Sequence, residues 1–310
     1  YFNLFMSLYS FMLDIRIVRG EPEKARKALA DRGMEAPFDE LVAKDREWRD
    51  LLQKAEELRK RRNTLSQEVS ARKKAGGNVD ALMEESRQVP KLIQSYEEQL
   101  RTVEEEVRQL SLMIPNVPHA RVPVGKDEKA NVEVRKWGEP QKMAFKPKAH
   151  HELGEKLGVF DFERGAMLSG ERFTVVKGAA AQLSRALINF MLDSHGKKGY
   201  VEVSPPLLVT TKTMTGTGQL PKFEDDLYKL ERDGLWAIPT AEVPLTNMHA
   251  EQILEYRDLP KYYAAYTPCF RREAGAHGKD TRGMIRQHQF DKVELVKLVH
   301  QENSYDELEK

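Results

Sequence analysis

Four residues near the C-terminal end of the sequence have side chains suited to binding a charged ligand: Arg271, Glu273, Phe290 and Glu294. Side chains alternate between strand faces, so Arg271 and Glu273 share one face of a predicted strand, as Phe290 and Glu294 do on the next. A guanidinium group binds phosphate or carboxylate oxygens bidentately, a carboxylate can hold an ammonium group, and an aromatic ring can stack on a base. The pattern is equally typical of a charged, solvent-facing strand pair, and spacing alone leaves both interpretations open.

A second candidate is the tripeptide Thr240-Ala241-Glu242, which follows a predicted strand and precedes an apolar, helical run over 243–253. A hydroxyl and a carboxylate at this position could bind a polar ligand. Spacing alone favours a helix start at Thr240 or Pro239, because a threonine caps free backbone N–H groups and Glu242 in the first turn interacts favourably with the helix dipole.

Several other chemistries lack their sequence signatures. The sequence contains no G-x-x-x-x-G-K-[ST] phosphate loop, no G-x-S-x-G nucleophile turn and no zincin histidine pair. The pair His150-His151 lies in a stretch with lysine and proline and is predicted to be a surface feature. Cys269, the only cysteine, excludes an internal disulfide and a cysteine-rich metal site, and we expect it to be a small buried hydrophobe in a reducing cytoplasm. Hydrolase and P-loop functions are therefore disfavoured.

The elements that must position these residues form a mixed domain. Hydrophobic periodicity predicts a helix over 179–194 and strands over 172–177, 200–203, 227–230, 235–238, 262–273 and 287–299. Asp233-Gly234 is a hairpin signal, and a glycine-bearing loop over 274–283 separates the last two strands. Successive strands joined by hairpins indicate an antiparallel sheet with helices packed on it, an α+β fold.

The region over about 44–112 is different, because it is rich in Glu, Lys, Arg, Gln and Leu and contains one proline, Pro90. Two series of residues repeat at alternating spacings of four and three, which is a heptad seam. The first series is Leu51, Ala55, Leu58, Arg62, Leu65, Val69 and Arg72, and the second is Leu82, Ser86, Val89, Ile93, Tyr96, Leu100, Val103, Val107 and Leu110. Residues 74–78 supply the turn between them. We expect a projecting antiparallel coiled-coil arm of about 45 to 50 Å.

The predicted arm carries a cationic surface near its turn. Seven basic residues and one acidic residue, Glu68, occur between positions 59 and 74. The basic residues are Arg59, Lys60, Arg61, Arg62, Arg72, Lys73 and Lys74. An ordinary solvated coiled-coil face remains the alternative to a binding surface.

Length and composition limit the number of domains and the classes of partner that the sequence allows. At 310 residues the chain is long enough for two domains, and Pro115, Pro118 and Pro123 mark a linker near 114–125. The formal net charge is +1, so bulk charge neither indicates nor excludes a nucleic-acid partner. We expect no membrane span, because no stretch reaches about 18 uncharged apolar residues. Residues 1–11 are expected to be an extension ahead of a natural start at Met12.

Taken together, ordered motifs over residues 12–310 resemble bacterial-type seryl-tRNA synthetase, a class II aminoacyl-tRNA synthetase. The motifs begin with Met12-Leu13-Asp14, the arm and Met113-Ile114-Pro115-Asn116-Val117-Pro118. They continue with Thr215-Gly216-Thr217-Gly218-Gln219-Leu220-Pro221-Lys222-Phe223 and Pro239-Thr240-Ala241-Glu242-Val243-Pro244-Leu245-Thr246-Asn247. The last are Phe270-Arg271-Arg272-Glu273-Ala274-Gly275, Asp280-Thr281-Arg282-Gly283 and His288-Gln289-Phe290-Asp291-Lys292-Val293-Glu294.

The resemblance implies a domain order and a set of site residues. A tRNA-binding domain would span 12–120 and a class II catalytic domain 121–310. ATP-binding positions would be Arg271, Arg272, Glu273, Gln287 and Phe290, with Arg271 as the catalytic residue at the α-phosphate. L-serine-binding positions would be Thr240, Ala241, Glu242 and Glu294. The seven basic residues of the arm would bind tRNA.

The resemblance also implies a reaction and partners. The enzyme would activate L-serine with ATP and Mg²⁺ and charge tRNA(Ser), with tRNA(Sec) as a second candidate, in the cytoplasm. The segment from Ala179 through Gly199 to Pro205 resembles class II motif 1, whose packing would form a homodimer. The sequence ends before motif 3, so the catalytic domain is expected to be incomplete and the fragment alone inactive.

Two other functions remain as alternatives. A non-catalytic tRNA-binding synthetase-like protein would have decayed site residues, whereas Arg271, Glu273, Phe290 and Glu294 are intact. An amino-acid:carrier-protein ligase should lack the long basic arm that this sequence predicts.

Overall fold

The computed structural model describes residues 13–125, 127–275 and 282–310, and the chain divides into two compact units, 1–136 and 137–310. The expected start at Met12, the extension before it and part of the loop over 274–283 lie outside the described residues. No helix in the described part is long and apolar enough to cross a membrane.

The first unit is helical. It contains α1 (Ile15–Gly20), α2 (Pro22–Arg32), α3 (Phe38–Lys74), α4 (Asp80–Met113) and a 3₁₀ turn, η2 (Glu128–Ala130). Asp14 begins α1 by accepting a hydrogen bond from the Arg16 backbone N–H at 2.8 Å, and Gly33 ends α2 in the left-handed conformation.

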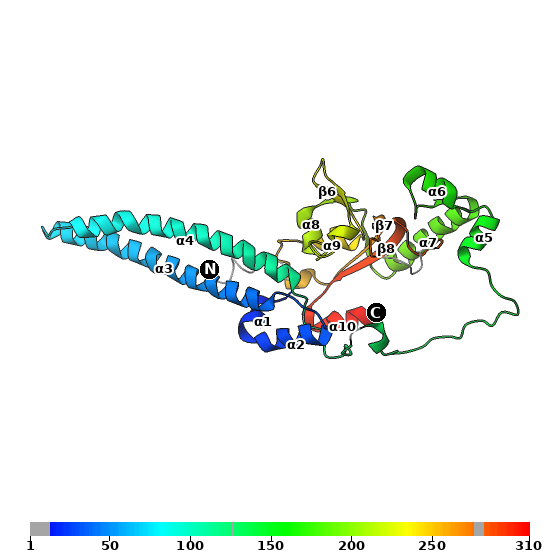
Figure 1. Ribbon diagram of the computed structural model, residues 1–310, viewed down its shortest axis with the longest axis horizontal. Coiled ribbons are helices and arrows are strands. Elements are labelled where there is room, and N and C mark those ends of the chain that lie inside the picture. Colours follow the sequence, from blue (N-terminus) through cyan, green and yellow to red (C-terminus); the bar gives the residue numbers. More distant parts are fainter. Residues whose placement is uncertain (1–12, 126, 276–281) are drawn as a thin grey trace. The chain divides into compact units, whose positions relative to one another are not determined.

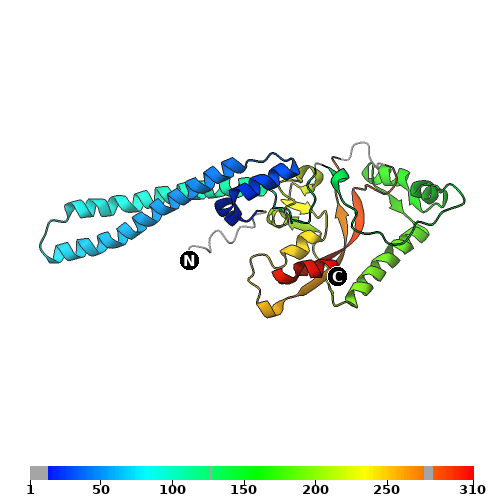
Figure 2. The same ribbon diagram turned by 90° about the horizontal axis from the view of Figure 1, so that it is seen from below.

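Helices α3 and α4 run side by side and are joined by a short turn, which confirms the predicted two-helix arm (Figure 1). The second view shows the same pairing from another side (Figure 2). Seam residues from both helices are buried together: Leu51, Ala55, Leu65, Val89, Ile93, Leu100, Val103, Val107 and Leu110. Three other residues that the heptad spacing assigns to the seam, Arg62, Arg72 and Ser86, are exposed. Apolar packing along the seam is therefore interrupted toward the turn, because polar side chains there remain in water.

A buried ion pair stabilises the base of the arm. Asp45 of α3 is 1 % exposed and accepts hydrogen bonds from Arg19 of α1 at 2.7 Å and from Arg49 at 3.0 Å. A buried carboxylate is tolerated only with such partners, so α1 is held against α3 by charge as well as by apolar packing.

The second unit combines short helices with small sheets. Its helices are α5 (His150–Lys156), α6 (Phe162–Ser169), α7 (Gly178–Gly196), α8 (Thr211–Gly216), α9 (Glu242–Asn247) and α10 (Ser304–Glu309). Its strands are β1 (Phe160–Asp161), β2 (Val175–Val176), β3 (Val201–Glu202), β4 (Leu208–Thr210), β5 (Tyr228–Leu230), β6 (Leu235–Ala237), β7 (Lys261–Phe270) and β8 (Gln289–Leu298). The described part of this unit also contains the 3₁₀ turns η3 (Glu224–Asp226), η4 (Tyr256–Asp258) and η5 (Gln301–Asn303).

Within the described residues the strands form three sheets, ordered β1-β2, β3-β7-β8 and β4-β6-β5. The β5–β6 hairpin and the antiparallel β7–β8 pair confirm the predictions for those segments, whereas β3 pairs with β7 in parallel. The fold is α+β as expected, with one parallel pair in an otherwise antiparallel arrangement.

Three predicted elements are shorter than expected, and in each case the backbone gives the reason. The first strand is reduced to β2 because Arg172 has φ +62°, and β7 stops at Phe270 with Glu273 at φ +52°. Helix α9 ends at Asn247, and Glu251 at φ +62° prevents its continuation. Non-glycine residues rarely adopt this left-handed conformation, and it interrupts a regular element.

Candidate active site

The β7–β8 pair provides the platform of the candidate site. Three residues of β8 alternate onto one face, each opposite a buried residue of β7: Phe290 opposite Cys269, Lys292 opposite Thr267, and Glu294 opposite Ala265. Residues that pair across an antiparallel sheet share a face, so these buried β7 residues lie beside the half-buried β8 row on the same side of the sheet.

Arg271 and Phe290 lie together at one end of this platform. The Arg271 guanidinium carbon is 5.1 Å from the centre of the Phe290 ring, and its Nε donates to the Pro239 carbonyl oxygen at 3.3 Å. A guanidinium over an aromatic face is stabilised by the cation–π interaction. The structure therefore fixes a cation directly beside a stacking surface.

A pocket of about 400 Å³ opens beside Arg271. Its lining residues are Gln219, Phe223, Asp226, Leu227, Pro239, Arg271, Glu273, Gly275 and Arg286. Arg271 and Glu273 reach the same pocket even though Glu273 lies beyond the end of β7. Glu273 Oε2 accepts a hydrogen bond from Arg286 Nη1 at 2.9 Å, and the Asp226 carboxylate also lines the cavity, so two guanidinium groups and two carboxylates surround it. Such a set can bind a multiply charged anion and select its orientation.

Two other residues predicted to bind ATP, Arg272 and Gln287, do not line this pocket. The Arg272 guanidinium carbon is 5.9 Å from the Tyr228 ring, and its side chain does not line the pocket. Gln287 is 6 % exposed, accepts from Thr174 Oγ1 at 2.6 Å and donates to the Gly283 carbonyl at 2.9 Å. Its amide therefore holds the loop before β8 in place.

The positions predicted for serine meet at the other end of the platform. Thr240 is 3 % exposed, and its Oγ1 donates to Glu294 Oε2 at 2.5 Å. The same hydroxyl accepts from Lys292 Nζ at 2.9 Å and from the Glu242 backbone N–H at 3.2 Å. Lys292 Nζ is also 2.5 Å from Glu294 Oε2. A hydroxyl, an ammonium group and a carboxylate thus form one connected cluster.

The start of α9 supports this cluster. Ala241 is fully buried against Leu245 and Ala265, which fixes the segment over β7, while Glu242 is exposed in the first turn of the helix. The hydrogen bond from the Glu242 N–H to Thr240 Oγ1 is a local turn contact before the helix, whose N-cap residue is Ala241 and has no side-chain cap. The prediction that Thr240 caps the helix is therefore wrong, and its hydroxyl is directed to Glu294 instead.

Cys269 is buried on the same face of the sheet, opposite Phe290. Burial raises the pKa of its thiol, while a hydrogen bond with Thr267 and the charges of Lys292 and Arg271 act in the opposite direction. The thiol therefore stays protonated at neutral pH and packs as a small apolar group.

Sequence reasoning missed Lys292, Arg286, Gln219 and Phe223 as residues of this region. Lys292 could have been found, because it lies midway between Phe290 and Glu294 and the alternation rule places it on their face. Arg286 lies in a loop, where no periodicity predicts the direction of a side chain.

The arm presents the predicted basic residues in two groups. Arg59 pairs with Glu97 at 2.7 Å, and Arg61 pairs with Glu85 at 2.7 Å and Glu68 at 3.0 Å. The hydrogen bonds that Arg61 donates to Glu85 raise the pKa of the Arg61 guanidinium, and these contacts tie α3 to α4. The other five are exposed and have no ion pair within the described residues: Lys60, Arg62, Arg72, Lys73 and Lys74.

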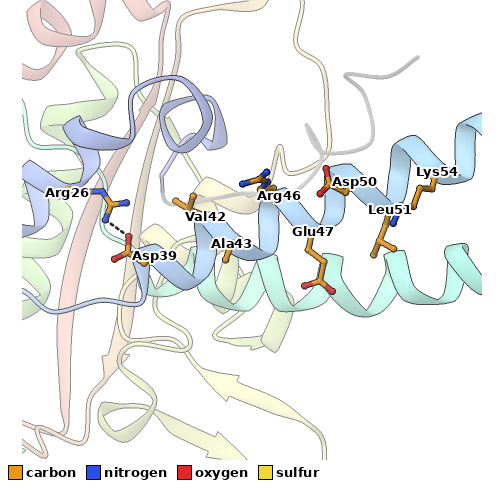
Figure 3. A pocket seen from close by; sticks show the side chains of 9 residues that line it. All are labelled: Arg26, Asp39, Val42, Ala43, Arg46, Glu47, Asp50, Leu51 and Lys54. Atoms are coloured by element: carbon orange, nitrogen blue, oxygen red, sulfur yellow. Dashed lines mark hydrogen bonds and ion pairs between the residues drawn. The ribbon is translucent and has the colours of Figure 1, made fainter.

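A hollow near the base of α3 is a weaker candidate (Figure 3). It is lined by Arg26, Asp39, Val42, Ala43, Arg46, Glu47, Asp50, Leu51 and Lys54. Arg26 already pairs with Asp39, and the remaining charges are mixed in sign along the helix. This hollow lacks the convergent polar groups of a ligand site.

Within the described part of the chain, no group of three or more His, Cys, Asp or Glu side chains could hold a metal ion. The one carboxylate among the predicted ATP positions, Glu273, is paired with Arg286. The described residues therefore offer no group of three such ligands for Mg²⁺.

Two family models match the chain. The seryl-tRNA synthetase N-terminal domain matches residues 12–118, and the tRNA synthetase class II core domain (G, H, P, S and T) matches residues 225–310.

Individual proteins resemble the chain over almost its whole length. It is 53 % identical over 301 residues to the serine–tRNA ligase of Thermodesulfovibrio yellowstonii, covering 96 % of this chain and 71 % of the relative. The serine–tRNA ligase of Syntrophomonas wolfei is 53 % identical over 300 residues, with 96 % and 70 % covered. The chain thus spans about 71 % of the length of such relatives.

Solved structures agree with the sequence comparisons. Seryl-tRNA synthetase from Pyrococcus horikoshii, complexed with ATP, is 37 % identical with a TM-score of 0.89, covering 96 % of this chain and 72 % of that one. The cytoplasmic serine–tRNA ligase from Naegleria fowleri, in complex with AMP, is 28 % identical with a TM-score of 0.82 and the same coverage.

Proposed function

Because the chain belongs to the seryl-tRNA synthetase family, we propose that it activates L-serine with ATP and transfers the seryl group to tRNA(Ser). The observation that supports this most is the row of groups along one face of β8. Arg271 and Phe290 occupy one end of the row, and the cluster of Thr240 and Glu294 occupies the other. The two ends suit a nucleotide and a small hydroxylated amino acid in contact with each other.

In the first step, a carboxylate oxygen of serine attacks the α-phosphorus of ATP, the bond to the bridging oxygen breaks, and pyrophosphate leaves. Arg271 binds the α-phosphate and neutralises the charge that develops on its oxygens, and Phe290 stacks on the adenine. Glu294 holds the serine ammonium group, and Glu242 and Thr240 supply further polar contacts. The nucleophile belongs to the substrate, so catalysis depends on alignment and charge rather than on an activated side chain.

Mg²⁺ would enter with the nucleotide, bound by its phosphates, because the described residues offer no metal site of their own. We assign no step of the reaction to it.

The arm is proposed to bind the tRNA. Structured RNA is recognised mostly through shape, phosphates and 2′-hydroxyl groups, which suits a long stiff hairpin with exposed cations. Lys60, Arg62, Arg72, Lys73 and Lys74 are the exposed candidates, whereas Arg59 and Arg61 are already engaged in ion pairs. The same charging experiment also tests whether tRNA(Sec) is a substrate.

A homodimer through α7 is the proposed assembly. Four apolar side chains of this helix are exposed in the single chain: Leu183 (60 %), Leu187 (49 %), Phe190 (67 %) and Met191 (37 %). An apolar face of this kind is typical of an interface between subunits. We place the enzyme in the cytoplasm, consistent with its single buried thiol.

The experiment is serine-dependent exchange of pyrophosphate into ATP, followed by charging of purified tRNA(Ser) and tRNA(Sec) transcripts by the full-length protein. L-serine should support exchange, and L-alanine should be worse by a factor of about 10⁴, because it leaves the polar groups around Thr240 unpaired. Exchange with another amino acid and none with serine would contradict the proposal.

A further inference from the structure

Lys292 has no role in the proposal above, yet its ammonium group lies at the centre of the cluster. Its Nζ is 2.5 Å from Glu294 Oε2 and 2.9 Å from Thr240 Oγ1. The Lys292 side chain is 33 % exposed, against 17 % for Glu294, so it can move while the carboxylate stays in place. In the structure Lys292 occupies the position at Glu294 that the ammonium group of an amino acid would need.

The register of β8 places Lys292 between the two ends of the site. Residues two apart on a strand are separated by about 7 Å, so Phe290, Lys292 and Glu294 form an evenly spaced row. A serine whose ammonium group is held by Glu294 must direct its carboxylate toward the α-phosphorus at the Arg271 end. That direction leads past Lys292.

An amino acid is a zwitterion, and the described cluster contains one charged group suited to each of its ends. Glu294 can pair with the ammonium group and Lys292 with the carboxylate. In the free protein these two side chains pair with each other instead. Entry of the zwitterion between them would exchange one ion pair for two, so neither charge is left unpaired.

We propose that Lys292 is a substrate-binding residue that leaves Glu294 when serine enters and holds the serine carboxylate in line with the α-phosphorus. The inference depends on the proposed function, because it assigns the carboxylate position of that same site. Lys292 would then select amino acids with a free carboxylate and orient the attacking oxygen.

The test compares L-serine with L-serinamide, in which the carboxylate charge is absent. In the full-length protein, Lys292→Gln should raise the KM for serine in pyrophosphate exchange by about 10- to 100-fold, as expected for a lost charge-assisted hydrogen bond. The inhibition constant of serinamide should be unchanged or lower, since Lys292 no longer competes for Glu294. Lys292→Arg should retain most of the affinity for serine.

Lys297→Gln is the matched control. Lys297 lies on β8 but on the opposite face, and its Nζ pairs with Glu307. This variant should leave the KM for serine unchanged. Thermal unfolding of each variant would show that the fold is retained.

The outcomes separate the inference from the function on which it depends. Equal weakening of serine and serinamide by Lys292→Gln would mean that Lys292 only supports Glu294 and Thr240, and an unchanged KM would mean that it has no part in binding. Either result overturns the inference while the proposed function stands. Absence of serine-dependent exchange in the unmodified protein would overturn both.

Discussion

Replacing Arg271 by alanine should reduce adenylate formation far more than the same replacement of its neighbour Arg272. Arg271 lines the pocket and is fixed by Pro239 and Phe290, whereas Arg272 lies over Tyr228, away from the pocket. The two residues are adjacent and identical in type, so the pair is a matched comparison of position alone.

The expected magnitude follows from the fixed position of the guanidinium. Removing one preorganised partner of a developing oxyanion typically costs a factor of about 10² to 10³ in rate, or about 3 to 4 kcal/mol. The cation–π contact with Phe290 contributes roughly 0.5 to 2 kcal/mol to local order, so loss of this contact should also weaken ATP binding. The rate of Arg271→Lys should lie between those of the unmodified protein and Arg271→Ala, because lysine keeps the positive charge but lacks the planar guanidinium group.

The assay is serine-dependent pyrophosphate exchange, measured at several ATP concentrations so that kcat and KM are separated. Arg271→Ala should lower kcat by about 10² or more. Arg272→Ala should change kcat by less than about fivefold, since a surface substitution away from the site has little effect. Similar losses of kcat for the two variants, or a small loss for Arg271→Ala, would refute the assignment of Arg271 to the pocket that binds ATP.

Three further changes have defined outcomes. Deleting 59–95 and joining the helix stubs with a short glycine linker should leave pyrophosphate exchange near normal and abolish tRNA charging. The slope of log tRNA affinity against log salt concentration should become shallower by roughly 0.7 to 0.9 per lost phosphate contact. Cys269 should react with iodoacetamide only after unfolding, as followed by mass spectrometry, because burial raises the pKa of its thiol. Asp161→Asn should lower the melting temperature at pH 7, and this deficit should shrink below pH ~4, because Lys177 and Arg164 hold the pKa of the Asp161 carboxyl below its ordinary value.

The sign of the Asp161 effect follows from its lowered pKa. The carboxylate contributes stability above its ordinary pKa, and that contribution is lost as the pH falls through the lower pKa of the folded state. A deficit that grows on acidification would contradict this.

The other two predictions also have contradicting outcomes. Unchanged charging at subsaturating tRNA after arm deletion would mean that the tRNA is bound elsewhere. Rapid alkylation of native Cys269 would show that it is not buried.

The arm could be predicted because its information is local and periodic. Leu65 and Val89 are buried where the heptad pattern places them, and the glycines between the helices mark the turn. Arg62 is exposed although Leu65, nearer the turn, is buried, because a charged side chain remains in water.

The site could be predicted only in part. Strand alternation places Phe290 and Glu294 on one face, as the register of β8 shows. The convergence of Arg271 with Glu273 and Arg286 depends instead on a backbone with φ +52° at Glu273 and on a loop, neither of which has a periodic signal. The bond between Thr240 and Glu294 joins residues 54 positions apart, so tertiary packing alone brings them together.

The assignment of the two ends of the site is tested most directly by a crystal structure of the full-length protein with a non-hydrolysable sulfamoyl analogue of seryl-adenylate. The adenine should stack on Phe290, the sulfamate should lie at Arg271, and the seryl ammonium group should contact Glu294. An adenine bound on the Tyr228 side beside Arg272, or a seryl group away from Thr240 and Glu294, would contradict the assignment.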